Sequence, residues 1–266
     1  MRRLAHISDL HFGAEDPLVA EGLLEDLARP LPHLVIVSGD LTQRAKKSQF
    51  QAARSYLDRI PVPQLIVPGN HDIPLYNVVA RFAGPLARYR HYITPDLHPF
   101  FHDEEIAVAG INTARSNTWK EGRISHAQIE TLRAQFAAVS PTLFKVLVCH
   151  HPFIPPVADK QSVVVVRVRE ALKSLEASHC AMILSGHLHL AYSGDVRPHH
   201  LEITRSILVA QAGTAISHRR RNEPNAYNRI TLDGDTLVLE VRAWDGKQFA
   251  TTASWDFRRV ESGWRV

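Results

Sequence analysis

Short apolar runs recur along the chain and constrain its fold more than any other feature of the sequence. Runs of this kind, apolar on both faces, suit central strands that are covered on each side. Segments with helical periodicity separate most of them. The predicted strands are Leu4–Ile7, Leu34–Val37, Leu65–Val67, Ile106–Ala109, Phe144–Cys149 and Met182–Leu184, and the predicted helices are Pro17–Ala28, Ser48–Asp58, Ser125–Val139 and Val165–Ala177. This alternation predicts an α/β sandwich.

The pattern changes after about residue 192, where strands follow one another without helices between them. The predicted strands are Ser206–Ala210, Tyr227–Leu232 and Thr236–Ala243, and Asp233-Gly234-Asp235 turns the second into the third. No linker rich in proline, glycine or serine precedes this part of the chain. We therefore expect residues of about 192–260 to form a second sheet packed on the first, and residues 1–266 to form one domain.

The stretch Ile73–Glu105 is the least regular part of the sequence. Its aromatic residues lie among prolines and basic residues, and they are Tyr76, Phe82, Tyr89, Tyr92, Phe100 and Phe101. Such a stretch can form a satellite hydrophobic cluster under long loops, or a cap over a substrate. We prefer the first interpretation because it is the more common one.

Composition excludes several classes of protein. With 45% hydrophobic and 22% charged residues, the chain resembles a folded protein rather than a disordered one. No apolar stretch approaches the ~20 residues that span a bilayer, so we expect no membrane span. The two cysteines, Cys149 and Cys180, suit a reducing compartment, and the basic N-terminus lacks the apolar segment of a signal peptide, so we expect a cytoplasmic protein. The formal net charge of +4 neither indicates nor excludes a nucleic-acid partner, and nothing in the sequence predicts the oligomeric state.

Histidine is the exception in this ordinary composition, with 16 residues in 266, and several histidines directly follow predicted strands. Five strands run into segments that can bind metals: Ser8-Asp9-Leu10-His11, Ser38-Gly39-Asp40, Pro68-Gly69-Asn70-His71-Asp72, His150-His151-Pro152 and Ser185-Gly186-His187-Leu188-His189. In an open α/β sheet, ligands gather outside the carboxyl ends of the strands. We therefore expect these five segments to converge on one site.

The spacing and number of these residues predict how metal ions would be held. Residues two apart in an extended chain point the same way, so Asp9 and His11 can address one ion, as can His187 and His189. The side chains with suitable donors are Asp9, His11, Asp40, Asn70, His150, His187 and His189. Seven ligands are too many for one catalytic ion, but two ions about 3.5–4 Å apart would use them all. The mixed oxygen and nitrogen donors favour Mn, Fe or Zn.

Taken in order, these segments resemble the motifs of the calcineurin-like metallophosphoesterase superfamily. The matching blocks are Asp9-x-His11, Gly39-Asp40, Gly69-Asn70-His71-Asp72, His150 and Gly186-His187-x-His189. One such block is a weak signal, whereas five in order are specific. The Asp9-Leu-His-Phe-Gly and Gly39-Asp-Leu-Thr segments, with the block at His150, most resemble bacterial class III cyclic-nucleotide phosphodiesterases.

The resemblance implies a four-layer α/β/β/α sandwich with two packed mixed sheets and a dinuclear metal site at the strand ends. In this family pattern the ligands of one ion are Asp9, His11 and His189, those of the other are Asn70, His150 and His187, and Asp40 bridges them. His71 matches a histidine that contacts the phosphate and is assigned as the general acid. Asp72 would orient His71 or serve packing.

Several residues near the motifs have two interpretations. The residues alone leave open which of His150 and His151 is a ligand, because neighbours at a strand end point in opposite directions. The family pattern selects His150 and makes His151 a supporting or substrate-contacting residue. Arg115 follows a strand end and could reach the substrate or lie in a solvated loop. Farther along the chain, His218 and Asn222 could line the pocket, and Arg219–Arg221 are expected at the surface.

The implied function is that of a metal-dependent phosphohydrolase, and a phosphodiesterase is the preferred interpretation. In this chemistry a metal-bridging hydroxide attacks the phosphorus of a small phosphate ester, for which a cyclic nucleotide is one candidate. A phosphomonoesterase or a nuclease would use the same ions. A non-catalytic scaffold would keep the fold but tends to lose the metal histidines, which this chain retains. Many relatives also carry an acidic residue where this chain has Gln43, which cannot serve as a carboxylate partner of His71.

Overall fold

The structure is a computed structural model that describes residues 1–118, 120–156, 164–220 and 223–265. Arg221 and Asn222, two of the residues considered above, lie outside the described residues. No helix in the described ranges is long and apolar enough to cross a bilayer.

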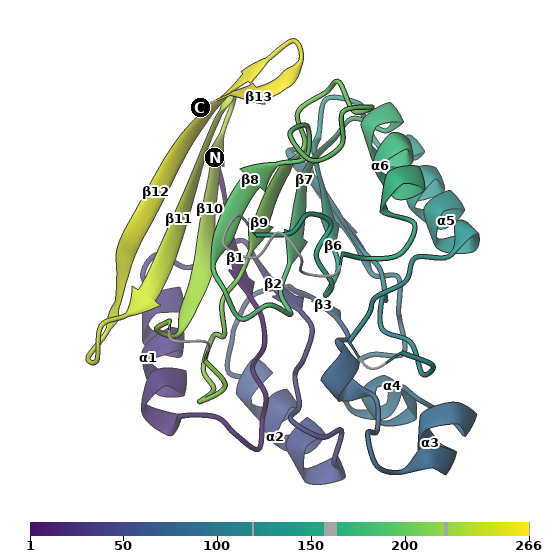
Figure 1. Ribbon diagram of the computed structural model, residues 1–266. Coiled ribbons are helices and arrows are strands. Elements are labelled where there is room, and N and C mark those ends of the chain that lie inside the picture. Colours follow the sequence, from purple (N-terminus) through teal and green to yellow (C-terminus); the bar gives the residue numbers. More distant parts are fainter. Residues whose placement is uncertain (119, 157–163, 221–222, 266) are drawn as a thin grey trace.

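Two mixed sheets form the centre of the molecule (Figure 1). The seven-stranded sheet has the order β13-β12-β11-β10-β1-β2-β3, with β1 (Arg2–Ile7), β2 (Leu34–Ser38), β3 (Gln64–Val67), β10 (Ala226–Asp233), β11 (Thr236–Trp244), β12 (Phe249–Val260) and β13 (Gly263–Arg265). The six-stranded sheet has the order β4-β5-β6-β7-β9-β8, with β4 (Phe100–His102), β5 (Ile106–Gly110), β6 (Phe144–Val148), β7 (Cys180–Ser185), β8 (Tyr192–Asp195) and β9 (Leu208–Gln211). Three neighbouring strands of the first sheet, β1 to β3, are parallel, as are β5, β6, β7 and β9 of the second.

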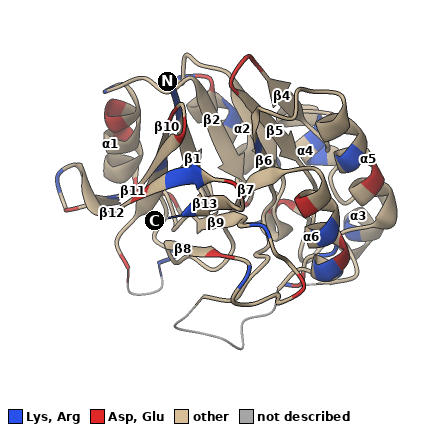
Figure 2. Cartoon of the chain, turned by 90° about the horizontal axis from the view of Figure 1, so that it is seen from above, with Lys and Arg blue, Asp and Glu red and all other residues tan. Residues whose placement is uncertain are grey.

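Helices cover the outer face of each sheet and complete four layers. Helices α1 (Pro17–Leu27), α2 (Lys47–Leu57) and α4 (Ala87–Tyr92) pack on the first sheet, and α5 (His126–Ala137) and α6 (Val168–Ala177) pack on the second. The short helices α3 (Val78–Ala83) and η1 (Asn70–Asp72) connect other elements. Lys, Arg and Glu residues lie on the outer helices α5 and α6 (Figure 2). The predicted α/β/β/α sandwich with two mixed sheets is therefore confirmed.

The two-sided burial of the central strands explains the apolar runs in the sequence. In β1, Leu4 packs between the two sheets, whereas Ala5 and Ile7 face the layer of α1 and α2. In β6, Val146 lies between the sheets and Leu147 lies under α5 and α6. Since both faces of these strands are covered, both are apolar, and all six predicted core strands occur within two residues of their predicted bounds.

The predicted helices also occur, and their ends follow local chemistry. Ser125 is the N-cap of α5, where its side chain accepts from the backbone of Gln128 and the Gln128 side chain accepts in return from the backbone of Ser125. Helix α6 begins at Val168 rather than Val165, because Arg167 has a left-handed backbone with a φ of 69°.

The prediction that the C-terminal strands form a separate second sheet was wrong. Strand β10 pairs with β1 and is followed by β11 to β13, so these strands widen the first sheet. Strand β9 instead joins the second sheet beside β7. The predicted turn is present, since Asp233 pairs with Thr236 across Gly234. Strand β12 was not predicted because it lies near the sheet edge, where only two of its twelve residues, Phe249 and Phe257, are buried.

The region Ile73–Glu105 is more regular than expected, since it contains α3, α4 and β4. The predicted hydrophobic cluster exists at Tyr89, which is fully buried and donates its hydroxyl proton to the carbonyl of Ile66. Tyr76 and Phe82 remain exposed. Both cysteines are free and buried, and burial raises the pKa of the Cys180 thiol to about 12 and that of Cys149 further still. Cys149 is thus an unreactive core residue, as its place in an apolar run predicts.

Candidate metal centre

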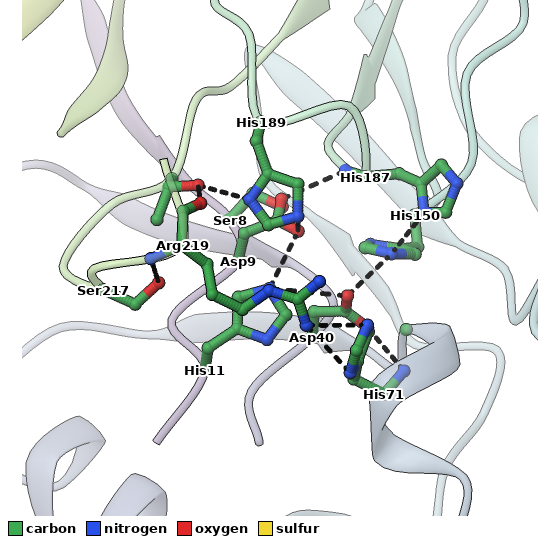
Figure 3. A network of polar contacts seen from close by, with 12 residues as sticks. Ser8, Asp9, His11, Asp40, His71, His150, His187, His189, Ser217 and Arg219 are labelled. Atoms are coloured by element: carbon green, nitrogen blue, oxygen red, sulfur yellow. Dashed lines mark hydrogen bonds and ion pairs between the residues drawn. The ribbon is translucent and has the colours of Figure 1, made fainter. Parts of the chain in front are cut away.

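The loops that follow β1, β2, β3, β6 and β7 meet at one end of the two sheets and bring the candidate ligands together (Figure 3). Backbone hydrogen bonds join the loops pairwise. The amide of His11 donates to the carbonyl of Asp40 at 2.9 Å, and the amide of Gly186 donates to the carbonyl of His150 at 3.0 Å. The amide of His187 donates to the Asp9 carboxylate at 3.0 Å and thereby links the two sheets. The predicted convergence of the strand ends is present in the structure.

Most of the candidate ligands have a strained backbone. The described chain has eight non-glycine residues with positive φ, and five are candidate ligands: Asp9, His11, Asp40, His187 and His189. Such conformations are uncommon outside glycine and concentrate at functional sites. The loops are therefore turned rather than extended at these positions, so the argument from residues two apart does not apply. Asp9 and His11 still lie in one group, but His187 and His189 belong to different ones.

The first group contains Asp9, His11 and His189, whose ligand atoms lie within 4.8 Å of one another. Oδ1 of Asp9 lies 3.5 Å from Nε2 of His11 and 3.6 Å from Nε2 of His189. Burial acts to raise the pKa of Asp9, but His189 and His11 outweigh this effect and hold the pKa below its usual value. The Thr214 hydroxyl donates to the carbonyl of Arg219, so it accepts from Nδ1 of His189 and leaves Nε2 free to bind a cation.

The second group contains Asn70, His150 and His187. Oδ1 of Asn70 lies 3.1 Å from Nε2 of His150 and 3.0 Å from Nδ1 of His187, and these two nitrogens are 3.3 Å apart. Nδ1 of His150 donates to the carbonyl of Ser38 at 2.8 Å, which leaves Nε2 as the atom that faces the group. Burial lowers the pKa of His187 to about 3, so this imidazole is neutral and able to donate a lone pair.

Asp40 lies between the two groups. Its Oδ2 atom is 3.7 Å from Nε2 of His11 and 3.4 Å from Nε2 of His150, while Oδ1 accepts the backbone proton of His71 at 2.8 Å. Burial acts to raise the pKa of Asp40, yet His150 and His71 hold it well below its usual value. An ionised carboxylate at this position can contact a cation in either group.

The donor set fits metal ions because several buried polar atoms lack hydrogen-bond partners and ligand atoms lie close together. Oδ1 of Asp9 and both ring nitrogens of His11 are buried without a hydrogen-bond partner among the described residues. In the second group the amide oxygen of Asn70 faces ring nitrogens. Buried acceptors in such an arrangement are costly unless a cation or a proton lies among them. Burial alone lowers the pKa of His150, but Asp40 raises it to about 9. Without a metal ion, a proton on His150 therefore supplies the positive charge between these acceptors.

Two glycines permit the close approach of the loops. A Cβ atom on Gly69 would lie 2.1 Å from Oδ1 of Asp40, and one on Gly186 would lie 1.9 Å from Oγ of Ser8. Of the glycines that precede Asp40, Asn70 and His187, only Gly39 has the positive φ, of 97°, that a sharp turn requires. The glycines before Asn70 and His187 therefore serve close packing against Asp40 and Asp9 rather than chain reversal.

His71 lies beside Asp40 and contacts neutral groups and one arginine. Its Nδ1 donates to the backbone carbonyl of Gln43 at 3.0 Å, and Nη1 of Arg219 lies 3.0 Å from its Nε2 (Figure 3). Burial lowers the pKa of His71 below its usual value. The backbone of Gln43 thus contacts the ring at the position where many relatives are expected to offer a carboxylate.

Two of the remaining candidates, Asp72 and Arg115, have different surroundings. The Asp72 carboxylate accepts from the backbone of Gly69, Leu41 and Thr42, so it holds two loops together, and burial together with Asp40 raises its pKa to about 6. Arg115 donates to Gln128 and to the backbone of two neighbouring residues, at the start of α5. Asp72 therefore has a packing role, and Arg115 is bound to the start of α5 through Gln128.

His150 and His151 both lie near His187, because β6 ends at Val148 and strand alternation no longer applies. The ring centroids of His150 and His151 are 5.1 Å and 4.7 Å from that of His187. Nδ1 of His151 forms a hydrogen bond with the hydroxyl group of Thr113. The buried Nε2 of His151 has no hydrogen-bond partner among the described residues. Of the two, His150 has the described contacts with Asp40 and Asn70, which favours it as the ligand.

Two residues of the site were not found from the sequence. Arg219 was expected at the surface but is half-buried and contacts His71. Thr214 orients His189, although threonine is too common for its position to signal this role. Both precede β10, and the topology that returns this segment to the site is not visible in local patterns. His218 is exposed, and its ring lies 3.8 Å from Asp16.

A four-layer sandwich with paired groups of Asp, Asn and His at the strand ends is characteristic of a metal-binding hydrolase fold. The chain belongs to the calcineurin-like phosphoesterase family, whose model matches residues 2–191. Membership of this family supports a metal-dependent phosphoester hydrolase.

Similar proteins support this assignment. A protein of Synechococcus sp., described as a probable cyclic nucleotide phosphodiesterase, is 22% identical over 207 residues, which cover 71% of this chain and 74% of that protein. The structure of a purple acid phosphatase from yellow lupin (Lupinus luteus) has a TM-score of 0.72 and 14% identity, and it matches 96% of this chain. This chain spans only 53% of the lupin enzyme. A dimetal phosphatase from Danio rerio has a TM-score of 0.66 and 14% identity, with 94% and 98% of the two chains covered. At these identities the solved structures establish the fold.

Proposed function

We propose that this chain is a dinuclear metal-dependent phosphodiesterase. The observation that carries the proposal is the convergence of two groups of side chains that can bind metal ions on the carboxylate of Asp40. One group would hold an ion through Asp9, His11 and His189. The other would use Asn70, His150 and His187. Two such ions would lower the pKa of a bound water and polarise the oxygens of a phosphoryl group.

The residues of the chain would position these ions and the substrate. Thr214 and the Ser38 carbonyl fix the rings of His189 and His150, so that the nitrogen facing the site is an acceptor. His71 lies at the edge of the site with its Nδ1 held by Gln43. We assign to it the delivery of a proton to the departing alkoxide oxygen, a role that requires Arg219 to move away from Nε2 so that this nitrogen can carry a proton.

The preference for a diester rests on a relative and on the sequence motifs. The Synechococcus protein is described as a probable cyclic nucleotide phosphodiesterase. A cyclic nucleotide is therefore one candidate substrate for this chain, and a phosphomonoesterase or nuclease activity is the alternative. Mn, Fe and Zn are the ions that the mixed donors favour. The cytoplasmic location stays a prediction.

Hydrolysis of two aryl phosphates tests the proposal. The protein loaded with Mn²⁺ is expected to release nitrophenol from bis(p-nitrophenyl) phosphate with a kcat/KM at least about tenfold higher than from p-nitrophenyl phosphate, a difference of roughly 1.4 kcal/mol in transition-state stabilisation. A preference for the monoester would favour a phosphatase, and cleavage confined to DNA or RNA would favour a nuclease. Absence of all these activities would contradict the proposal.

A further inference from the structure

A pocket beside the candidate ligands is lined by three positively charged side chains together with the neutral residues Gln43, Ile73 and Leu75. It has a volume of about 190 Å³ and is bordered by Asn70 and His71 on the side of the metal centre. Arg44, Lys120 and Arg219 also line it. These three residues come from separate loops, between β2 and α2, between β5 and α5, and between β9 and β10. The pocket is thus cationic because the fold brings three distant segments together.

None of these three cations is paired with an acidic side chain within the described part of the chain. The guanidinium of Arg44 lies 5.2 Å from the ring centroid of the exposed Tyr76. Arg219 contacts His71 and the Gln43 side chain, which is neutral. Uncompensated charges of one sign that line a concave pocket attract a ligand of the opposite sign. The natural occupant of this pocket is therefore an anion.

Arg219 is held in place by the same residue that orients a candidate metal ligand. Its carbonyl accepts the hydroxyl proton of Thr214 at 2.9 Å, and Thr214 in turn contacts Nδ1 of His189. The Arg219 amide donates to Oγ of Ser217, whose carbonyl accepts from the side chain of Asn225. Because the backbone is fixed at several points and the guanidinium contacts His71 and Gln43, the side chain is already partly ordered before a ligand binds.

The number of charges indicates which anion fits. Two divalent ions would be neutralised in half by Asp9 and Asp40, and the three side chains of the pocket add three further positive charges. A phosphodiester carries a single negative charge, so it would leave the pocket uncompensated. A phosphate monoester is close to a dianion near neutral pH and offers oxygens that match the planar fork of arginine.

We propose that this pocket binds a second phosphate group, and that the preferred substrate is a phosphodiester in which one alcohol also carries a phosphate monoester. The inference rests on the proposed function, because it places the scissile phosphate at the two ions beside Asn70 and His71. Arg219 would contact the second phosphate directly, with Lys120 and Arg44 completing its surroundings. The pocket would then determine specificity while the metal centre performs the hydrolysis.

A matched pair of substrates tests the proposal. Thymidine 5′-(p-nitrophenyl phosphate) and its 3′-phosphorylated form differ only in the second phosphate. The parent protein with Mn²⁺ is expected to hydrolyse the 3′-phosphorylated ester with a kcat/KM about 10- to 100-fold higher, the range that one or two charged hydrogen bonds supply. In Arg219→Gln the ratio of the two kcat/KM values is expected to fall toward one. Arg220→Gln, which removes the same charge from an exposed position of the same loop, should keep the parental ratio.

Two results would overturn the proposal. The first is a parental ratio near one. The second is an equal loss of kcat/KM for both esters in Arg219→Gln, which would assign Arg219 to the scissile phosphate or to His71 rather than to a second phosphate. If Arg219→Gln is not folded by circular dichroism, Lys120→Gln provides the same test, because Lys120 is exposed and lines the same pocket. Lys120→Gln is expected to lower the ratio, and an unchanged ratio would count against the subsite.

Binding of the products separates a failure of this proposal from a failure of the proposed function. Calorimetry is expected to show that thymidine 3′,5′-bisphosphate binds the Mn²⁺-loaded parent at least about tenfold more tightly than thymidine 5′-phosphate, and that Arg219→Gln removes this difference. If neither ester is hydrolysed but the binding difference is found, the subsite stands and the hydrolase proposal fails. If both esters are hydrolysed equally and both products bind equally, the hydrolase proposal stands and the subsite is wrong.

Discussion

Replacing Asp40 with alanine is expected to abolish most of the hydrolysis of bis(p-nitrophenyl) phosphate. Asp40 is the one candidate ligand whose carboxylate oxygen lies within 4 Å of ring nitrogens from both groups, at His11 and His150. Loss of an outer partner of a metal ligand typically costs 10- to 100-fold in affinity or activity, so loss of a shared ligand should cost more than about 100-fold. The variant should also retain fewer metal ions after gel filtration, as measured by mass spectrometry.

A matched change on the surface controls for the loss of a carboxylate. Asp256 lies exposed on β12, so Asp256→Ala should keep the parental kcat/KM and metal content. Circular dichroism of Asp40→Ala should match that of the parent, since the two sheets are held by apolar contacts elsewhere. Full metal content together with parental activity in Asp40→Ala would rule out a bridging role for this residue.

Replacing Gly186 with alanine is expected to have the second large effect, on both stability and metal binding. The new Cβ would lie 1.9 Å from Oγ of Ser8 and 2.6 Å from Oδ2 of Asp9. Rotation of the Ser8 hydroxyl does not relieve the contact, because Cβ of Ser8 is itself only 2.8 Å away. Overpacking of this kind typically lowers the free energy of unfolding by about 1–3 kcal/mol. Displacement of Asp9 should also weaken the ion held with His11 and His189.

Chemical denaturation of the metal-free variant and metal analysis of the loaded variant measure the two effects separately. Gly213→Ala is the matched control, since the nearest atom to its added Cβ is 3.5 Å away and no positive φ is involved. We expect this control to remain within about 0.5 kcal/mol of the parent. If Gly186→Ala were as stable as Gly213→Ala and bound as much metal, the loops after β1 and β7 would not be packed as described.

The core of the fold could be predicted because its determinants are local. A strand buried on both faces needs consecutive apolar residues, and Leu34 to Val37 show this directly. The convergence of the site was also predictable, because parallel strands bring their carboxyl ends to one edge. The polar strand β12 and the division of the last strands between two sheets depend instead on which strand edges are available, and no local pattern reports this.

The candidate site was predicted in its residue types but not in its full chemistry. Asp9, Asp40 and His187 stand out by their positions after strands, yet their left-handed backbones cannot be seen in the sequence. Arg219 could not be found because it follows β9 by several residues and reaches His71 only through the tertiary fold. An arginine in a short basic run is usually solvated, and here tertiary contacts override that tendency.

The number of metal ions per chain tests the central claim most directly. The purified parent protein is loaded with Mn²⁺, separated from free metal by gel filtration and analysed by mass spectrometry against its protein concentration. The two groups of ligands on either side of Asp40 predict two ions per chain. A value of one would contradict a dinuclear centre, and a value of zero would contradict the assignment of these residues as metal ligands.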